Sequence, residues 1–433
     1  MFKKIGEPEA MEIGLKYGGT TQPLKLEADD VRVAVLTPKR TAPTRDGADL
    51  IRSALANPIG IPQLPQLVRP GHRVVIATSD ITRPCPSARL LPPLLHELNR
   101  AGIPDTDITV VFGLGIHRGH TAEERERLVG SDVYRRVRCI DPDPADAVHV
   151  GTTRRGTPVE VFRPVVEADF RIGVGVIEYH YFVGYSGGVK AYIPGVCTAT
   201  TIQHNHRRMT EPGAAAGNLD GNPVRDDLEE AGELIGVHFI LNAVLDETRC
   251  LVAVVAGHPR QAHRAGCAAL DAFGRDTVEE PADIVVVSAG GFPKDINVYQ
   301  AQKALDNARR VVRKGGILLL VAECREGLGD ETFEAWMKDP GGPDAILGRI
   351  RREFVLGGHK AAAVAMAMQQ ASIYFVSSLE AEYARSLGFS PFSDVNAAME
   401  EALKKVGPNP SILVLPEGGS VLPSVRDRMT NDK

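Results

Sequence analysis

The sequence predicts an α/β fold with two domains and mostly parallel sheets, and three observations support this prediction. At 433 residues, the chain is longer than one ordinary hydrophobic core organises. Short apolar runs rich in Val and Ile recur along it, as expected for buried strands. Helical patterns separate several of these runs. Such an alternation of strand and helix is typical of α/β layers.

The elements follow from these runs in chain order. Seven runs are predicted to be strands, namely VRVAVL (31–36), RVVIAT (73–78), ITVVFG (108–113), FRIGVGVI (170–177), IVVVSA (284–289), ILLLVA (317–322) and ILVLPE (412–417). Helical patterns follow the second run (PSARLLPPLLHELNRAG) and the fifth (NVYQAQKALDNARRVVRKGG). In the latter, Asn297 is expected to cap the helix and Gly315 or Gly316 to end it.

Domain boundaries are predicted from composition. Residues 271–282 (DAFGRDTVEEPA) are polar and lack periodicity, so we expect a linker there. The domains are then 1–272 and 283–411, with 412–433 as a segment that can pack back on the first domain.

The bulk composition excludes several classes of protein. A net charge of −5 with scattered basic residues predicts no nucleic-acid or membrane partner. The six cysteines never come closer than 17 positions, which predicts reduced thiols rather than redox or zinc motifs. The first residues lack an apolar run, and no stretch approaches the roughly 18 apolar residues of a membrane span. The expected location is the cytoplasm.

Two loops directly after predicted strands carry candidate site residues. In SDITRPCPS (79–87), Asp80 could accept from a sugar hydroxyl and Arg83 could clamp a carboxylate, although a simple turn with a surface ion pair fits as well. In FGLGIHRGHTAEE, His117 suits acid/base work, whereas His120 fits an ordinary loop histidine. Thr121 with Glu124 predicts a helix capping box.

The segment IEYHYFVGYSGGVKAYIPG (177–195) is the richest in chemistry. Its glycines surround Ser186 in a loop whose amides could cradle a phosphate, and Lys190 follows two positions later. The spacing is not that of a Walker loop. Lys190 could be a phosphate counter-charge, a Schiff-base amine or an attachment point. The alternative is a glycine-rich turn with a solvated lysine.

Two further segments add candidate ligands. In TTIQHNHRRM, His204 and His206 would point apart on a helix, so one of them is the expected metal ligand. No spacing supplies a conventional zinc site, so a bound metal needs a non-protein ligand. In AGGFPKDINVYQAQKA, Gln300 and Lys303 share a helix face that suits a carboxylate, although a solvated face fits equally.

Taken together, these segments resemble the nickel-dependent lactate racemase family. The resemblance is in five motifs in the same order, SDITRP, GIHRGHTAEE, EYHYFVGYSGGVKAYIPG, QHNHRRM and GGFPKDINVYQAQK. It implies a nickel-pincer nucleotide, a nicotinate-derived mononucleotide that holds nickel through a ring carbon and two sulfurs. By resemblance, Lys190 forms the covalent link and His206 is the protein ligand to nickel. Asp80 lies near the ribose, and the phosphate loop comprises Gly184, Tyr185, Ser186, Gly187 and Gly188.

The resemblance also implies an activity. His117 and His180 match the paired catalytic histidines, and Arg83, Gln300 and Lys303 match residues around the substrate carboxylate. The implied reaction is racemisation or epimerisation of a 2-hydroxy acid by reversible hydride transfer through a 2-oxo acid, in a cleft between the two domains. Separate cofactor-biosynthesis enzymes are the implied partners for loading.

The substrate is left open by one departure from the lactate enzymes. The chain reads VLGGHKAAAVAMAM at 355–368, with His359 and Lys360 where the lactate-specific pattern has a Trp-containing segment. A short lactate-like acid is the first expectation, and malate, an aldonic acid or a 3-hydroxy acid are alternatives. Outside this family, a metal hydrolase using His117, His180 and His206, or a nucleotide- or metabolite-binding protein without catalysis, also fits the motifs.

Overall fold

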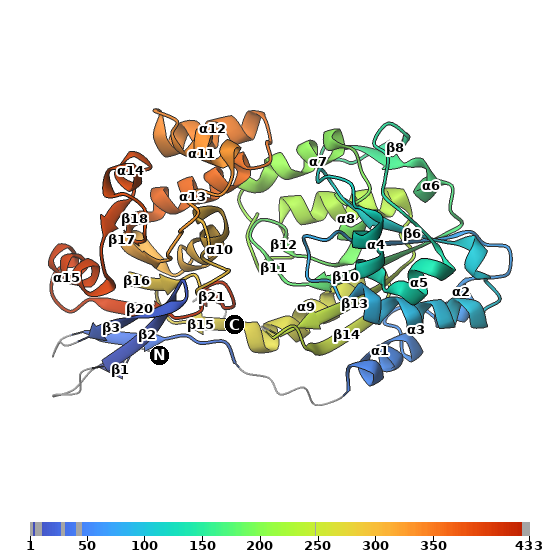
Figure 1. The fold of residues 1–433 in the computed structure, drawn as a ribbon, viewed down its shortest axis with the longest axis horizontal. Coiled ribbons are helices and arrows are strands. Elements are labelled where there is room, and N and C mark those ends of the chain that lie inside the picture. Colours follow the sequence, from blue (N-terminus) through green and yellow to red (C-terminus); the bar gives the residue numbers. More distant parts are fainter. Residues whose placement is uncertain (1–2, 5–10, 27–30, 40–45, 247, 427–433) are drawn as a thin grey trace, which may run out of the picture. The chain divides into compact units, whose positions relative to one another are not determined.

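The structure is a computed structural model that describes residues 3–4, 11–26, 31–39, 46–246 and 248–426. It divides the chain into two compact units (Figure 1). We call residues 40–272 the inserted unit, and residues 1–39 with 273–433 the split unit, because the first interrupts the second.

The inserted unit is built on a six-stranded sheet in the order β14-β13-β10-β5-β6-β7, parallel except for β14 against β13. Its elements are α1 (Gly47–Ala56), α2 (Leu64–Leu67), β5 (Val74–Ser79), α3 (Ser87–Arg100), η1 (Asp105–Asp107), β6 (Ile108–Gly113), α4 (Ala122–Val129), α5 (Ser131–Arg136), β7 (Arg138–Ile140), β8 (Ala147–Thr152), β9 (Pro158–Phe162), α6 (Arg163–Val166), β10 (Phe170–Ile177), β11 (Tyr179–His180), β12 (Gly184–Tyr185), η2 (Gly188–Ala191), α7 (Ala199–His206), η3 (Arg207–Thr210), α8 (Pro223–Ile235), β13 (Phe239–Leu245), β14 (Leu251–Gly257) and α9 (Pro259–Gly274). One face of the sheet packs on α1 to α5 in a core of leucine, isoleucine and valine. The turn η2 lies against the sheet strands β5, β10 and β13.

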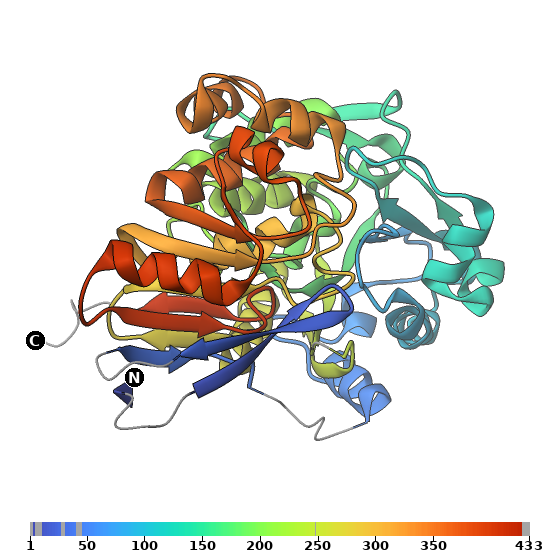
Figure 2. The same cartoon turned by 60° about the vertical axis from the view of Figure 1, so that its left-hand side comes forward.

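The split unit is built on a seven-stranded sheet in the order β1-β4-β20-β16-β17-β18-β19, parallel except for β1. Its elements are β1 (Lys3–Lys4), β2 (Met11–Tyr17), β3 (Thr20–Leu26), β4 (Arg32–Val35), β15 (Arg275–Val278), β16 (Ala282–Ser288), α10 (Val298–Ala308), β17 (Val312–Val321), α11 (Glu331–Met337), α12 (Gly342–Arg352), α13 (Gly358–Gln370), β18 (Ala371–Val376), α14 (Ala381–Ser386), β19 (Ser390–Phe392), α15 (Val395–Val406), β20 (Ser411–Leu415) and β21 (Leu422–Val425). The β2–β3 hairpin and α15 share one hydrophobic core with the sheet. Figure 2 shows both elements beside the sheet.

The predicted fold class is confirmed, and so are all seven predicted strands. Each run coincides with a strand of one of the two large sheets, from β4 to β20. The Asn297 side chain caps α10 by accepting from the Gln300 amide, as predicted. The predicted capping box of Thr121 and Glu124 is also present at the start of α4.

Two local predictions are wrong. Helix α10 ends at Ala308 rather than at Gly315 or Gly316, because the buried β-branched pair Val311 and Val312 already leads into β17. The predicted linker is not irregular, since α9 runs to Gly274 and β15 pairs with β21. Its polar composition reflects a short, partly exposed strand.

The domain boundaries also differ from the predicted ones. The chain passes between units after Ala272, but residues 1–39 belong with the C-terminal part rather than with 40–272. The reason is strand pairing, because β4 lies parallel to β20. The segment from residue 412 is therefore central to the sheet of the split unit, where β20 lies between β4 and β16, while residues 427–433 lie outside the described part.

A search of the helices in the described part of the chain turned up none with the length and apolar character needed to span a lipid bilayer.

Candidate active site

Three neighbouring strands of the inserted unit end at the predicted site loops. Strands β10, β5 and β6 are parallel and adjacent, so their carboxyl ends lie at the same edge of the sheet. The loop after β5 carries Asp80 and Arg83, the loop after β6 carries His117, and the segment after β10 carries His180 and Lys190. This edge is where open α/β sheets bind ligands.

Asp80 and His117 form a hydrogen-bonded pair across two of these loops. The ring Nδ1 of His117 donates to Oδ2 of Asp80 at 2.6 Å, and the Thr82 hydroxyl donates to the same carboxylate. Asp80 is buried, whereas the His117 side chain keeps 31% of its surface exposed. Burial favours the neutral acid, but the hydrogen bonds from His117 and Thr82 outweigh it, so the pKa of Asp80 lies below its usual value. The pair has the geometry of an acid/base histidine oriented by a carboxylate.

His120 has a structural position, in line with the ordinary loop histidine predicted for it. Its Nδ1 donates to Asp141 at 2.7 Å, and its Nε2 accepts from the Ile81 amide at 3.1 Å. It therefore ties the loop after β5 to the end of β7.

Lys190 lies on the short turn η2, which is packed tightly against the end of β6. A Cβ on Gly113, the last residue of β6, would lie 3.0 Å from the carbonyl oxygen of Ala191, the last residue of η2. The Gly115 amide also donates to the Gly195 carbonyl. Within the described residues, the half-buried Lys190 amine has no hydrogen bond or ion pair. Burial, reinforced by the charges of Arg83 and Arg225, lowers the pKa of Lys190 well below its usual value. The amine is therefore shifted toward its neutral, nucleophilic form.

The glycine-rich loop is held largely by the protein itself. The Ser186 hydroxyl donates to the Val176 carbonyl and accepts from the Glu178 amide. The Ser186 amide donates to Glu178, and the Gly188 amide donates to Asn242 at 2.7 Å. The Ser186 hydroxyl and both of these amides are thus engaged internally, which leaves fewer groups for a phosphate than the sequence suggested.

Glycine is required in this loop by the backbone. Gly184, Gly187 and Gly188 all adopt positive φ angles, between 64° and 84°. A Cβ on Gly184 would also lie 2.1 Å from the Asn218 carbonyl oxygen. Tyr185 is buried, and its hydroxyl donates to Asp271 at 2.8 Å.

Arg225 of α8 and His263 of α9 hold the same loop from behind. Arg225 donates to the carbonyls of Val183 and Tyr185, and the His263 Nε2 donates to that of Ser186 at 2.8 Å. Burial and the neighbouring Arg225 lower the pKa of His263 well below its usual value, so the ring is neutral. Sequence reasoning missed both residues.

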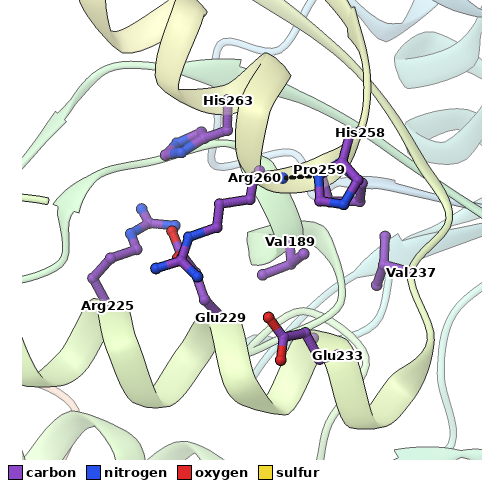
Figure 3. A pocket seen from close by; sticks show the side chains of 11 residues that line it. Val189, Arg225, Glu229, Glu233, Val237, His258, Pro259, Arg260 and His263 are labelled. Carbon is purple, nitrogen blue, oxygen red and sulfur yellow. Dashed lines mark hydrogen bonds and ion pairs between the residues drawn. The ribbon is translucent and has the colours of Figure 1, made fainter. Parts of the chain in front are cut away.

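A cavity of about 240 Å³ lies between the turn η2 and the helices α8 and α9 (Figure 3). Arg225, Glu229 and Glu233 reach it from α8, and His263 and Arg260 from α9. Glu229 is buried and forms an ion pair with Arg260, with 2.9 Å between Oε2 and Nε. The cavity beside Gly188 and Val189 is therefore lined by charged side chains as well as by apolar ones.

His180 and His206 both contact the ring of Phe182. The His180 ring lies edge-on to Phe182 at 4.6 Å between centroids, and the His206 ring lies edge-on to it at 5.0 Å. His206 is buried at the end of α7, and its Nδ1 hydrogen-bonds the Asn205 side-chain oxygen at 2.9 Å. His204, in contrast, bonds the Thr200 carbonyl of its own helix.

The residues that the structure describes contain no group of three His, Cys, Asp or Glu side chains that could share a metal ion. The structure thus does not assemble His117, His180 and His206 into the three-histidine centre of a hydrolase.

Gln300 and Lys303 lie in the split unit, on the first turns of α10. The Lys303 amine donates to the Gln300 side-chain oxygen at 3.1 Å, so the two share a face as predicted, and Lys303 is exposed. On the buried side of the same helix, Lys360 of α13 donates to Gln302 at 3.0 Å and lies over the ring of Tyr299.

Comparison with known proteins adds an independent line of evidence. Residues 17–217 match the family model of the lactate racemase N-terminal domain, and residues 277–423 match that of the C-terminal domain. Lactate racemase from Thermoanaerobacterium thermosaccharolyticum is 32% identical over 384 residues, covering 86% of this chain and 90% of that protein. Lactate racemase from Lactiplantibacillus plantarum is 32% identical over 387 residues, with the same coverage.

Solved structures agree. The lactate racemase apoprotein from T. thermosaccharolyticum matches with a TM-score of 0.86 at 31% identity, over 96% of this chain and all of that one. A protein from Thermotoga maritima has a TM-score of 0.62 at 19% identity, over 88% and 98% of the two chains, which shows a shared fold. The two family models, the two relatives and the first of these structures together show that this chain belongs to the lactate racemase family of isomerases.

Proposed function

We propose that the chain is a nickel-pincer-nucleotide-dependent racemase or epimerase of a 2-hydroxy acid, with a lactate-like short-chain acid as the first candidate. The observation that carries this proposal is the environment of Lys190. A desolvated amine without a partner among the described residues lies beside Arg83, in a family of racemases. The neighbouring strand end holds an oriented histidine.

The residues present fit the proposed cofactor. A neutral Lys190 amine can form the covalent thioamide link, which a protonated lysine cannot. His206 is buried and oriented through its Nδ1, an arrangement typical of a metal-binding imidazole. The phosphate would rest on groups of the Gly184–Gly188 loop that are not already bonded internally, with Asp80 toward the ribose.

The chain's own residues supply proton transfer. When bound, the nucleotide supplies a ring carbon that accepts hydride from C2 of the substrate and returns it. His117 takes the proton of the substrate hydroxyl, and Asp80 stabilises the imidazolium that results. His180 is proposed to lie on the opposite face of the substrate from His117. It can therefore return a proton to the substrate oxygen after the planar 2-oxo acid has turned.

The substrate carboxylate is assigned to three side chains. Arg83 can bind it with two parallel hydrogen bonds. Gln300 and Lys303 can bind it near the positive end of the α10 dipole. Exclusion of water from the bound substrate would retain the 2-oxo acid until the hydride returns.

A second substrate class is favoured by one observation. Lys360 adds a buried amine against α10, the helix that carries Gln300 and Lys303. An extra positive charge near that helix favours an acid with a second anionic or polar group, such as malate or an aldonic acid.

The enzyme is expected to act in the cytoplasm, where cofactor-biosynthesis enzymes load it.

Reconstitution tests the proposal. Protein incubated with the nickel-pincer nucleotide should gain mass on the peptide that contains Lys190, and it should abolish the optical rotation of one of a panel of 2-hydroxy acids. Substrate deuterated at C2 should retain its label in water, because hydride passes directly. Lys190→Arg is the matched control that keeps a long basic side chain but cannot form the link. Solvent exchange at C2, or full activity in Lys190→Arg, would contradict the proposal.

A further inference from the structure

A chain of buried hydrogen bonds leads from Asp227 to His206. The Asn205 side-chain nitrogen donates to the Asp227 carboxylate at 2.8 Å, and the Asn205 side-chain oxygen hydrogen-bonds Nδ1 of His206 at 2.9 Å. Asp227 and Asn205 are completely buried, and His206 is 8% exposed. The three residues join α8 to α7.

The orientation of the Asn205 amide is dictated by its surroundings. Its nitrogen faces two acceptors, the Asp227 carboxylate and the Val224 carbonyl at 3.1 Å. If the amide were flipped, its oxygen would face two other acceptor oxygens. Both buried hydrogen bonds would be lost and the oxygens would repel one another, which is costly. The amide oxygen must therefore face His206.

The protonation of His206 follows from this orientation. An amide oxygen only accepts, so the Nδ1 that contacts it must carry the hydrogen. In the neutral ring, the lone pair that can bind a metal is then on Nε2. We propose that Asp227 and Asn205 are positioning residues that fix the tautomer of His206, so that Nε2 is the nitrogen presented to nickel. This inference rests on the metal role proposed for His206.

The surroundings of Asp227 support a role beyond packing. Its carboxylate accepts from the hydroxyls of Thr153 at 2.5 Å and Thr157 at 2.8 Å as well as from Asn205. No Lys, Arg or His of the described ranges forms an ion pair with it. A buried carboxylate stabilised by neutral donors alone is costly to keep. A fixed set of three donors leaves Asn205 no second orientation.

The tautomer can be read in the protein without cofactor. With histidine labelled by ¹⁵N, two-bond ¹H–¹⁵N spectra distinguish the protonated nitrogen from the bare one, and His206→Gln identifies the signals. We expect His206 to carry its hydrogen on Nδ1. In Asn205→Ala, the population should move toward the Nε2–H form. The matched control Thr157→Val removes one donor to Asp227 but leaves Asn205 in place, and it should keep the wild-type pattern.

The possible results distinguish failure of this inference from failure of the proposed function. An Nε2–H tautomer in the wild type overturns the inference, and so does an unchanged tautomer in Asn205→Ala. If Asn205→Ala does not fold, the wild-type spectrum still decides. After loading, Asn205→Ala should retain nickel about 10- to 100-fold less tightly while its Lys190 adduct stays intact by mass. Absence of any Lys190 adduct in the wild type would instead defeat the proposed function, and the tautomer measurement would be unaffected.

Discussion

The two sets of predicted site residues differ in how the protein holds them. In the inserted unit, His117 and His206 each bond a side chain that is itself buried and bonded further. In the split unit, the Lys303 amine donates to the Gln300 side-chain oxygen, and the Lys303 side chain is exposed to solvent. The groups proposed for proton transfer and metal binding are thus preorganised by buried partners, whereas Lys303, proposed for the substrate carboxylate, lies at the surface.

This difference has an energetic meaning. Preorganised groups lose little entropy in the transition state, so removing one should lower kcat. The exposed Lys303 is proposed only to bind the substrate carboxylate, so its loss should mainly weaken substrate binding. Six substitutions test this contrast, from the largest expected effect to the smallest.

Lys190→Ala should reduce racemisation to background, because the cofactor then has no covalent attachment. Intact mass and nickel content after loading measure the cause, and polarimetry measures the effect. Substantial activity with a loosely bound cofactor would show that the desolvated amine is not the attachment point.

His117→Ala should lower kcat by roughly 10²- to 10⁴-fold, as expected for loss of an acid/base group. Asp80→Asn should also lower kcat, because the amide cannot stabilise the imidazolium as a carboxylate does. In the wild type, the pKa of Asp80 lies below its usual value. Asp80 should therefore stay ionised and support the His117 imidazolium as pH falls, until the pH reaches this lowered pKa. Kinetics with one enantiomer at several pH values test both variants.

Cofactor loading of Asp80→Asn distinguishes two roles of this carboxylate. It should leave cofactor loading close to that of the wild type if Asp80 acts through His117. If loading fails instead, the carboxylate serves the ribose, as the resemblance implied.

Lys303→Ala should raise KM by about 10- to 100-fold with a smaller change in kcat, since a hydrogen bond to a charged group contributes roughly 1.5–3 kcal/mol. Gln300→Ala should act in the same direction but more weakly. Initial rates over a range of substrate concentration measure both parameters. A dominant loss in kcat would break the contrast between the two sets.

Lys190→Met should stabilise the protein without cofactor by roughly 1 kcal/mol, or about 2–4 °C in Tm. The folded pKa of Lys190 is below 10.5, so between the two values the unfolded chain binds a proton that the folded chain does not. Wild-type stability should therefore rise with pH across that window, and the variant should lose this contribution. Thermal unfolding against pH measures it. An identical pH profile would argue against a desolvated amine.

Much of the fold was predictable because its signals are local. Buried parallel strands are continuous apolar runs, and all seven were found, as were the caps at Thr121 and Asn297. The end of α10 was not predictable from glycine alone, since buried Val311 and Val312 override a stop signal four residues later. The assignment of residues 1–39 depends on pairing between β4 and β20, which no local pattern reveals.

The candidate site was predicted in its chemical groups but not in its supports. His117, Lys190 and His206 stand out by residue type and motif. Arg225 and Asp227 do not, because the sequence NPVRDDLEEAG predicts an ordinary charged helix face. The signal that could have found them is periodicity, since both occupy buried positions of α8 beside Val224 and Leu228. A charged residue at a buried position of an amphipathic helix predicts that a polar partner lies next to it in the core.

The insertion of one unit within the other has a consequence for synthesis on the ribosome. Strand β4 is made early, but its neighbour β20 appears only when the chain is nearly finished. At about 5–20 residues per second, the first strand waits tens of seconds with one edge uncovered. Residues 40–272 emerge as one continuous stretch during that wait and can fold first. The inserted unit, which carries Lys190, should therefore fold well before β20 can join the sheet of the split unit.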